Sequence, residues 1–197
     1  MITTALVKTL RERTGAGVMD CKVALEEVNG DLERAVILLR ERGMAAAQRK
    51  AVREAREGVV ESYVHFGGRI GVLVEVLCET DFVARNERFR AFAHDLALQV
   101  AAARPQWVGR EDIPGRILEE ERAVYRQQAL NDGKSGPVVE RIAAGRLEKF
   151  VAERCLLEQT FIKDPDRKVK DLVTELIALL GENVRVGRFA RLEVGES

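Results

Sequence analysis

A hydroxyl, a carboxylate and a large aromatic ring follow one another at Thr80, Asp81 and Phe82. They come directly after a strand-like run at residues 70–78 and before an amphipathic helical pattern that begins near Phe89. A carboxylate beside an apolar ring suits two tasks, because the pair can start a helix or can project from a turn to bind another molecule. The elements on either side decide between these tasks.

Helical spacing by itself favours a buried Phe82. A helix that begins at Thr80 puts Phe82 and Phe89, seven residues apart, on one stripe, and such a stripe is typical of a core-facing side. Asn86 is also a good N-cap, with Phe89 as the first residue of the regular stripe. If the helix starts there, Phe82 lies in the turn and is free to face outward. Spacing favours the first interpretation and leaves the second open.

The segment Thr14-Gly15-Ala16-Gly17 has the glycines of a phosphate-binding loop, because glycine lets backbone N–H groups approach an anion at a helix N-terminus. The rest of that motif is missing. No strand pattern precedes the segment, Asp20 stands three positions after Gly17, and the Lys-Ser/Thr pair of a nucleotide loop is absent. Spacing therefore predicts a glycine-permitted turn between two helices.

Other residue types that carry out covalent chemistry have no suitable partners in the sequence. His65 and His94 have no nearby set of cysteine, histidine and carboxylate at metal-ligand spacing, and the cysteines lie far apart. No serine sits in a nucleophile elbow, and the carboxylates fall mostly on charged helical faces. The sequence predicts no metal site, no cofactor and no enzyme.

The composition of the chain limits the classes of molecule that it is expected to bind and the compartments in which it is expected to occur. The 197 residues include 32 basic and 32 acidic side chains, a balance that argues against a nucleic-acid footprint. Cys21, Cys78 and Cys155 sit among apolar residues, which favours free buried thiols over disulfides. The N-terminal residues lack the apolar core of a signal peptide, and no run approaches membrane-spanning length. We expect a soluble, cytoplasmic protein that binds neither nucleic acid nor membrane.

Glycines divide residues 1–43 into three short helical patterns, which predicts a small three-helix domain. The patterns stop near Gly15, at Asn29-Gly30 and at Gly43. Residues 44–58 are Ala-rich and highly charged, which predicts a helical linker with little apolar surface to bury. The core of such a small domain gives only marginal stability on its own.

Residues 59–197 carry the patterns of an α+β domain, a three-stranded antiparallel sheet packed with helices. Strand patterns at residues 59–66 and 70–78 are joined by Gly67-Gly68, which predicts a β-hairpin. Residues 184–194 predict the third strand. Four helical patterns are expected to supply the helices, and they begin near Phe89, Arg116, Pro137 and Val169.

Two long segments resemble a known family. The run LRERTGAGVMDCKVAL at residues 10–25 and the run EVLCETDFVAR at residues 75–85 resemble the two signature segments of elongation factor Ts, in the right order and separation. Residues 144–147 and 188–195 are also similar to that family. The whole chain resembles its short bacterial form.

The resemblance implies a guanine-nucleotide exchange factor for elongation factor Tu, the GTPase that carries aminoacyl-tRNA to the ribosome. Such a factor binds the GDP form, displaces Mg2+ and promotes GDP release so that GTP can rebind. In that family the Thr-Asp-Phe-Val turn is associated with Mg2+ displacement, which gives this role to Thr80, Asp81, Phe82 and Val83. A UBA-like three-helix domain docks on the partner's nucleotide domain, and the matching docking residues are Thr14, Gly15, Ala16, Gly17, Val18, Met19, Asp20 and Lys22.

The resemblance also implies a homodimer, because short forms of the family are expected to dimerise. The edge of the strand at residues 184–194 is a candidate seam, although a helix can also cover such an edge. One alternative function stays open, a binding adaptor whose three-helix head recognises some other protein while the α+β domain oligomerises. Release of fluorescent GDP from elongation factor Tu distinguishes the two functions.

Overall fold

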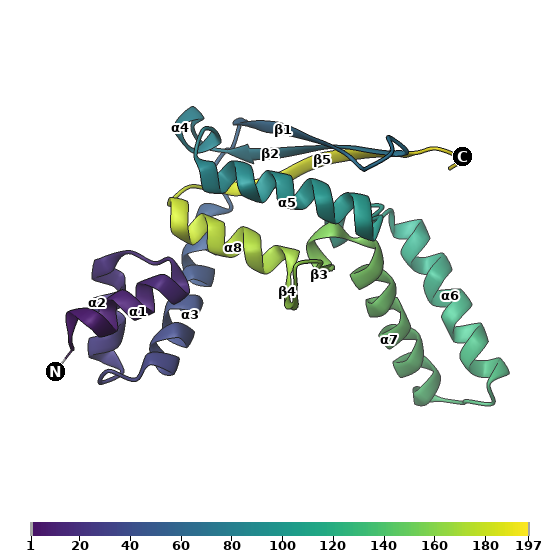
Figure 1. Cartoon of the computed structure of the whole chain (residues 1–197). Helices are drawn as coiled ribbons and strands as arrows, with labels where there is room; N and C mark the ends of the chain where they lie inside the picture. The colour runs from purple at the N-terminus through teal and green to yellow at the C-terminus, as the bar shows by residue number, and fades with distance from the viewer. Residues whose placement is uncertain (1, 197) are drawn as a thin grey trace. The chain divides into compact units, whose positions relative to one another are not determined.

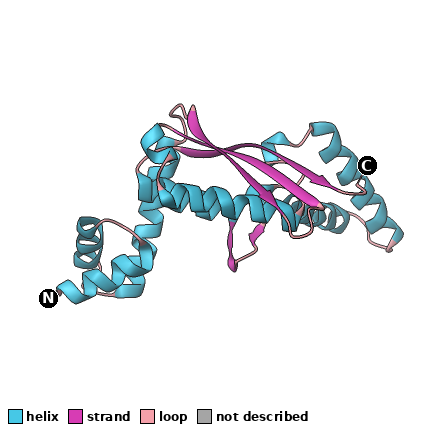
Figure 2. Ribbon diagram, turned by 45° about the horizontal axis from the view of Figure 1, so that its top comes forward, coloured by secondary structure: helices cyan, strands magenta, loops and turns pink. Residues whose placement is uncertain are grey.

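A computed structural model of the chain, which describes residues 2–196, has the expected α+β architecture (Figures 1 and 2). The chain divides into two compact units. The first consists of Met1–Val59, Val76–Arg90 and Asp171–Arg185, and the second of Val60–Glu75, Ala91–Lys170 and Val186–Ser197. Each unit is thus assembled from segments that are far apart in the sequence.

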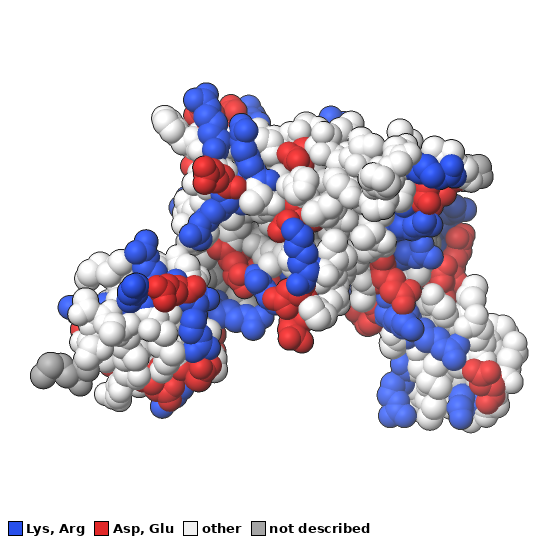
Figure 3. Space-filling model, in the orientation of Figure 1, with Lys and Arg blue, Asp and Glu red and all other residues white. Residues whose placement is uncertain are grey.

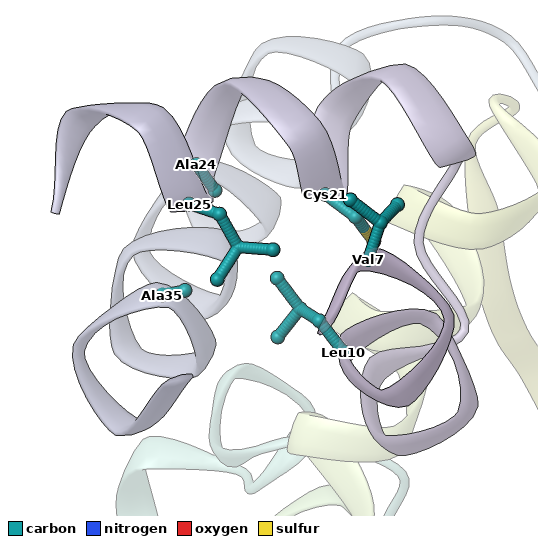
Figure 4. Close-up of a cluster of buried hydrophobic side chains, with 6 residues drawn as sticks. All are labelled: Val7, Leu10, Cys21, Ala24, Leu25 and Ala35. Atoms are coloured by element: carbon teal, nitrogen blue, oxygen red, sulfur yellow. The ribbon is translucent and has the colours of Figure 1, made fainter. Parts of the chain in front are cut away.

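The first unit contains a bundle of three helices, α1 (Thr4–Thr14), α2 (Val18–Glu27) and α3 (Leu32–Lys50). Side-chain oxygens cap two of them, because Thr3 accepts from the N–H of Leu6 and Asp31 accepts from the N–H of Arg34. The helices meet around a small apolar core (Figure 4), which consists of Val7, Leu10, Cys21, Ala24, Leu25 and Ala35. The prediction of three helices in this region is confirmed.

The third helix does not stop at Gly43 as the sequence pattern predicted, but continues to Lys50. A glycine inside a helix costs only about 1 kcal/mol relative to alanine, and the Ala-rich residues that follow favour the helix. The lack of a side chain also serves packing, since a Cβ on Gly43 would lie 3.3 Å from the Cβ of Ala178. The helical part of residues 44–58 is therefore shorter than expected, with β1 beginning at Glu57.

The strands β1 (Glu57–Val64), β2 (Ile70–Cys78) and β5 (Val184–Glu193) form a three-stranded antiparallel sheet in the order β1-β2-β5. The predicted hairpin is confirmed. Gly67 and Gly68 both have positive φ, 85° and 69°, a conformation that glycine adopts without strain. The N–H of His65 donates to the carbonyl of Ile70 across the turn, at 2.9 Å.

In the second unit, one face of the strands is covered by α5 (Glu87–Ala103), seen beside the sheet in Figures 1 and 2. Val72 and Val74 of β2 are buried, and so are Ala93, Leu96 and Ala97 of α5. Leu73, whose side chain alternates with these along β2, is exposed. The sheet therefore has one covered face and one face with apolar side chains in solvent.

Two further helices of the second unit, α6 (Gly115–Asn131) and α7 (Pro137–Arg154), pack on each other as a helical hairpin (Figure 1). Pro137 begins α7, where its missing N–H is not needed. Short 3-10 helices at Arg110–Asp112 and Leu156–Glu158 lie before and after this hairpin.

The remaining elements are short, apart from one long helix. A small sheet that sequence patterns did not predict pairs β3 (Thr160–Phe161) with β4 (Asp164–Lys168). The helix α8 (Val169–Leu180) ends at Gly181, which has a positive φ of 79°. Between β2 and α5 lies α4 (Asp81–Ala84), a single turn of helix.

Candidate functional site

The connection between β2 and α5, residues 79–86, contains Thr80 and the four residues of α4. Thr80 is the N-cap of α4, and its side-chain oxygen accepts from the N–H of Val83 at 3.4 Å. The carboxylate of Asp81 forms an ion pair with Arg85 at 2.9 Å. A second cap then restarts the helix, because Oδ1 of Asn86 accepts from the N–H of Arg88 at 2.9 Å.

This interruption decides the orientation of Phe82. The ring of Phe82 is 81% exposed, whereas Phe89, seven residues later, is 0% exposed. A continuous helix would put both rings on the same stripe, but the chain leaves the helix at Arg85 and starts α5 at Glu87. The interpretation of Phe82 as a core residue, which spacing favoured, is wrong. Phe82 projects from the turn into solvent.

The base of the turn is packed and hydrogen-bonded, in contrast to the ring. Ala84 is buried, and the thiol of Cys78 donates to the carbonyl of Thr80 at 3.2 Å. Burial, followed by the nearby carboxylate of Glu182, raises the pKa of Cys78 to about 11. The thiol therefore stays protonated at neutral pH and remains a hydrogen-bond donor.

The connection between α1 and α2 is a turn, as its glycines predicted. Gly15 ends α1 with a positive φ of 69°. The hydroxyl of Thr14 donates to the carbonyl of Leu10 at 2.8 Å and accepts from the N–H of Ala16 at 3.3 Å. Gly17 is the N-cap of α2 without a side-chain hydrogen bond, and a Cβ on it would lie 2.9 Å from Oδ2 of Asp20.

The solvent side of α2 carries three exposed apolar side chains, Val18, Met19 and Val23, which we call the outer surface of α2. Met19 is the most exposed of them, at 66%. Asp20 and Lys22 are exposed on the same helix. The opposite side of α2 contributes Cys21, Ala24 and Leu25 to the core of the bundle. A group of exposed apolar side chains that does not contribute to the core is typical of a binding surface.

Both groups of predicted site residues lie in the first unit. The loop at Gly15 is close to the beginning of α5, since a Cβ on Gly15 would lie 3.5 Å from Nη1 of Arg88 and 3.6 Å from Cδ1 of Leu179. Arg88 follows the Thr80–Val83 turn by only a few residues. The structure therefore brings together two segments that are more than 50 residues apart in the sequence.

Basic and acidic side chains are interspersed over the face shown in Figure 3. Within the described residues there is no group of three His, Cys, Asp or Glu side chains with the geometry to hold a metal ion, and no helix is long and apolar enough to cross a membrane. Cys21, Cys78 and Cys155 are free and buried, as predicted.

Comparison with known proteins assigns the family. The family model described as "Elongation factor TS" matches residues 4–196. The chain belongs to the elongation factor Ts family. It is 62% identical over 196 residues to elongation factor Ts of Carboxydothermus hydrogenoformans, covering 100% of this chain and 90% of the relative. Elongation factor Ts of Moorella thermoacetica is 61% identical, with 100% of this chain and 97% of the relative covered.

The match to elongation factor Ts includes both signature segments, and the structure adds residues that the sequence did not indicate. The carboxylate of Glu182, in the loop between α8 and β5, accepts from the N–H groups of Glu79 and Thr80 and from the hydroxyl of Thr80. These contacts join residues more than 100 positions apart. No local pattern signals such a pair, because its partners meet only in the folded chain.

Proposed function

We propose that two surfaces of the first unit carry out the guanine-nucleotide exchange that the elongation factor Ts family performs on elongation factor Tu during translation elongation. The outer surface of α2 and the adjoining loop dock on the partner. The Thr80–Val83 turn acts on the Mg2+ site of the partner's nucleotide pocket. The observation that carries this proposal is the exposure of Phe82 on a turn whose base is fixed.

Exchange of this kind needs no nucleophile and no acid or base from the chain. The factor binds the GDP form of the partner, and its complex is more stable when Mg2+ and the nucleotide have left. Binding energies are reciprocal, so a factor that binds the nucleotide-free partner more tightly must weaken the binding of nucleotide to the same extent. We therefore assign the chain a role in binding and conformational change, without a covalent step.

The ring of Phe82 alone does not provide the whole effect. Complete burial of a phenylalanine side chain contributes about 1.5–3 kcal/mol, which corresponds to about one to two powers of ten in affinity. A larger acceleration requires a wide interface that keeps the partner in a conformation with poor Mg2+ and phosphate coordination. Val18, Met19 and Val23 extend the contact area beyond the turn.

GDP and GTP occupy the same site of the partner, so the factor lowers the affinity of both nucleotides. Their concentrations then set the direction of exchange, and GTP rebinds where it is in excess. Elongation takes place in the cytoplasm, which is where we expect the chain to act. The even mixture of basic and acidic side chains supports a protein partner over direct contact with nucleic acid.

We also propose that the chain forms a homodimer through the open side and edge of its sheet. The strand β5 is an edge strand, and Leu192 on it is exposed. Val60, Val64 and Leu73 on the other strands of the second unit are exposed as well. A second copy would cover these apolar side chains and the free strand edge. Native mass spectrometry tests this, and a monomer at micromolar concentration would contradict it.

The exchange proposal is tested with elongation factor Tu that carries a fluorescent GDP analogue. The chain is added with excess unlabelled GDP, and the loss of fluorescence gives the rate of nucleotide release. We expect the rate to rise with the concentration of the chain and to reach a maximum when the partner is saturated. A rate equal to the spontaneous one at every concentration would overturn the proposed function.

A further inference from the structure

The loop between α8 and β5 contacts the Thr80–Val83 turn through one side chain, Glu182. We propose that Glu182 is a positioning residue for nucleotide exchange, whose carboxylate fixes the backbone that presents Phe82. The inference rests on the proposed function, because it assigns a new residue to the same site. Glu182 does not itself contact the partner in this proposal.

Three donors converge on the carboxylate of Glu182. Its Oε2 accepts from the N–H of Glu79 at 3.1 Å and from the N–H of Thr80 at 3.0 Å. Its Oε1 accepts from the hydroxyl of Thr80 at 2.6 Å. Hydrogen bonds to an ionised acceptor are about twice as strong as those between neutral groups. One side chain thus holds two successive peptide groups and the cap residue itself.

The hydrogen bond from the hydroxyl of Thr80 also orients the N-cap. A threonine hydroxyl has one hydrogen and two lone pairs. Because the hydrogen points to Glu182, a lone pair remains for the N–H of Val83, and that distance is 3.4 Å. The carbonyl of Thr80 accepts from the thiol of Cys78 and from the N–H of Ala84, both at 3.2 Å. Every polar group of Thr80 therefore has a partner.

These contacts matter for the turn because Ala84 is the one residue of α4 that is buried. A single helical turn such as α4 is unstable in isolation. The exposed ring of Phe82 has almost no packing that would set its direction. The backbone of α4 therefore sets the direction of the ring. Thr80 caps that backbone, and Glu182 holds Thr80 in place. A ring that is already held in its binding conformation loses less conformational entropy on docking.

A second carboxylate in the same place provides a matched control. Glu79 accepts from the N–H of Asn183 and pairs with Arg53 at 3.5 Å. Its side chain therefore also connects the end of β2 to the loop between α8 and β5. Neither of these two interactions involves Thr80. Substitution of Glu79 perturbs the same two segments and leaves the cap of α4 intact.

The decisive variant is Glu182→Gln, which keeps the size of the side chain. The carboxamide has only one oxygen, and its nitrogen cannot accept, so at least one of the three donors loses its partner. We expect the maximum rate of fluorescent-GDP release at saturating chain to fall about tenfold. The concentration that gives half of the maximum rate should change less than about threefold, because the outer surface of α2 is intact.

Two comparisons separate positioning from a general loss of structure. Glu79→Gln should lower the melting temperature about as much as Glu182→Gln, yet should keep most of the maximum rate. In a double-mutant cycle, Glu182→Gln should cause little further loss when it is added to Phe82→Ala, because the residue acts through that ring. Equal losses of rate in Glu79→Gln and Glu182→Gln, or fully additive losses in the cycle, would overturn the inference.

A second variant keeps the inference testable if Glu182→Gln does not fold. Thr80→Val has nearly the size of threonine but lacks the hydroxyl that donates to Glu182, so it should lower the maximum rate of GDP release. A wild-type maximum rate in Thr80→Val would overturn the inference. If the wild-type chain accelerates release and Phe82→Ala slows it, but Glu182→Gln has the wild-type rate, the inference fails while the proposed function stands. If the wild-type chain gives no acceleration, the proposed function itself fails.

Discussion

The outer surface of α2 and the Thr80–Val83 turn both present apolar side chains to solvent, but different interactions support them. The helix α2 has ten residues and lies on a core of its own, to which Cys21 and Leu25 contribute. Its exposed residues are therefore held in place by hydrophobic packing on the other side of the same helix. The docking surface stays intact as long as the bundle is folded.

Fewer residues of the turn are buried. Its helix has four residues, of which Ala84 is the buried one. Hydrogen bonds from Thr80 to Glu182 and from Cys78 to Thr80 fix the conformation of the turn, whereas hydrophobic packing fixes that of α2. The outer surface of α2 should therefore be lost only when the bundle unfolds, whereas the turn can lose its conformation while the protein remains folded.

The largest effect is expected at Phe89, which begins the buried stripe of α5 directly after the turn. Its side chain is 0% exposed. The change Phe89→Ala should lower the free energy of unfolding by about 3–5 kcal/mol, because it removes buried apolar area and leaves a cavity. Urea unfolding followed by circular dichroism measures this. A loss below about 1 kcal/mol would show that the core at this point is looser than its burial indicates.

A smaller effect, confined to function, is expected at Phe82. The change Phe82→Ala removes a ring that is exposed in the free chain, so the melting temperature should stay nearly the same. The maximum rate of GDP release should fall by about one to two powers of ten, which corresponds to the burial of one phenylalanine.

Phe66 provides a control for this change, because it has the same side chain and is 97% exposed at the tip of the hairpin in the second unit. Phe66→Ala should leave the rate of release unchanged. A fall of many degrees in the melting temperature of Phe82→Ala, with a proportional loss of exchange, would instead indicate a structural role for that ring.

The pair of phenylalanines also shows what the sequence can and cannot predict. Periodicity predicted the core position of Phe89 and the helices at residues 4–14 and 169–180, because one side of each helix must be apolar to pack. The same periodicity predicted burial of Phe82. It failed there because the cap at Asn86 restarts the helix, and periodicity carries no information across such a break.

Other features escaped prediction because they depend on distant parts of the chain. Gly43 lies inside a helix instead of ending it, and the close approach of Ala178 explains why a residue without a side chain fits there. The strand Asp164–Lys168 contains a proline and four charged residues, and most of these residue types are uncommon in strands. Its pairing with Thr160–Phe161 arises from the surrounding fold. Glu182 is 102 residues from Thr80, so that no local motif joins them.

The docking surface should respond to substitution in a different way from the turn. The change Met19→Ala should raise the concentration of chain needed for half of the maximum rate by about fivefold, which corresponds to about 1 kcal/mol. The maximum rate should not change, because the turn is intact. Ile37→Ala on α3 is the control, since Ile37 is also exposed but lies outside the outer surface of α2. A lower maximum rate in Met19→Ala would mean that the two surfaces do not have separate tasks.

The smallest effect concerns the thiol beneath the turn. Burial, followed by the carboxylate of Glu182, raises the pKa of Cys78 to about 11 from an ordinary value of 9.0. Between these two values the unfolded chain binds fewer protons at this residue than the folded chain, so stability falls as the pH rises through this range. Burial also raises the pKa of Cys155, in the second unit, to about 11, which gives a matched group outside the turn.

We therefore expect the melting temperature of the wild-type chain to decrease between about pH 9 and about pH 11, and the decrease to be smaller in Cys78→Ala and in Cys155→Ala. Only Cys78→Ala should also slow exchange at neutral pH, because it removes the donor to the carbonyl of Thr80. The loss should be smaller than for Glu182→Gln, since the N–H of Ala84 still donates to that carbonyl. If the two cysteine variants change exchange equally, the hydrogen bond from Cys78 to Thr80 does not hold the turn in its active conformation. The hydrogen bonds to Glu182 alone would then distinguish the turn from the packed surface of α2.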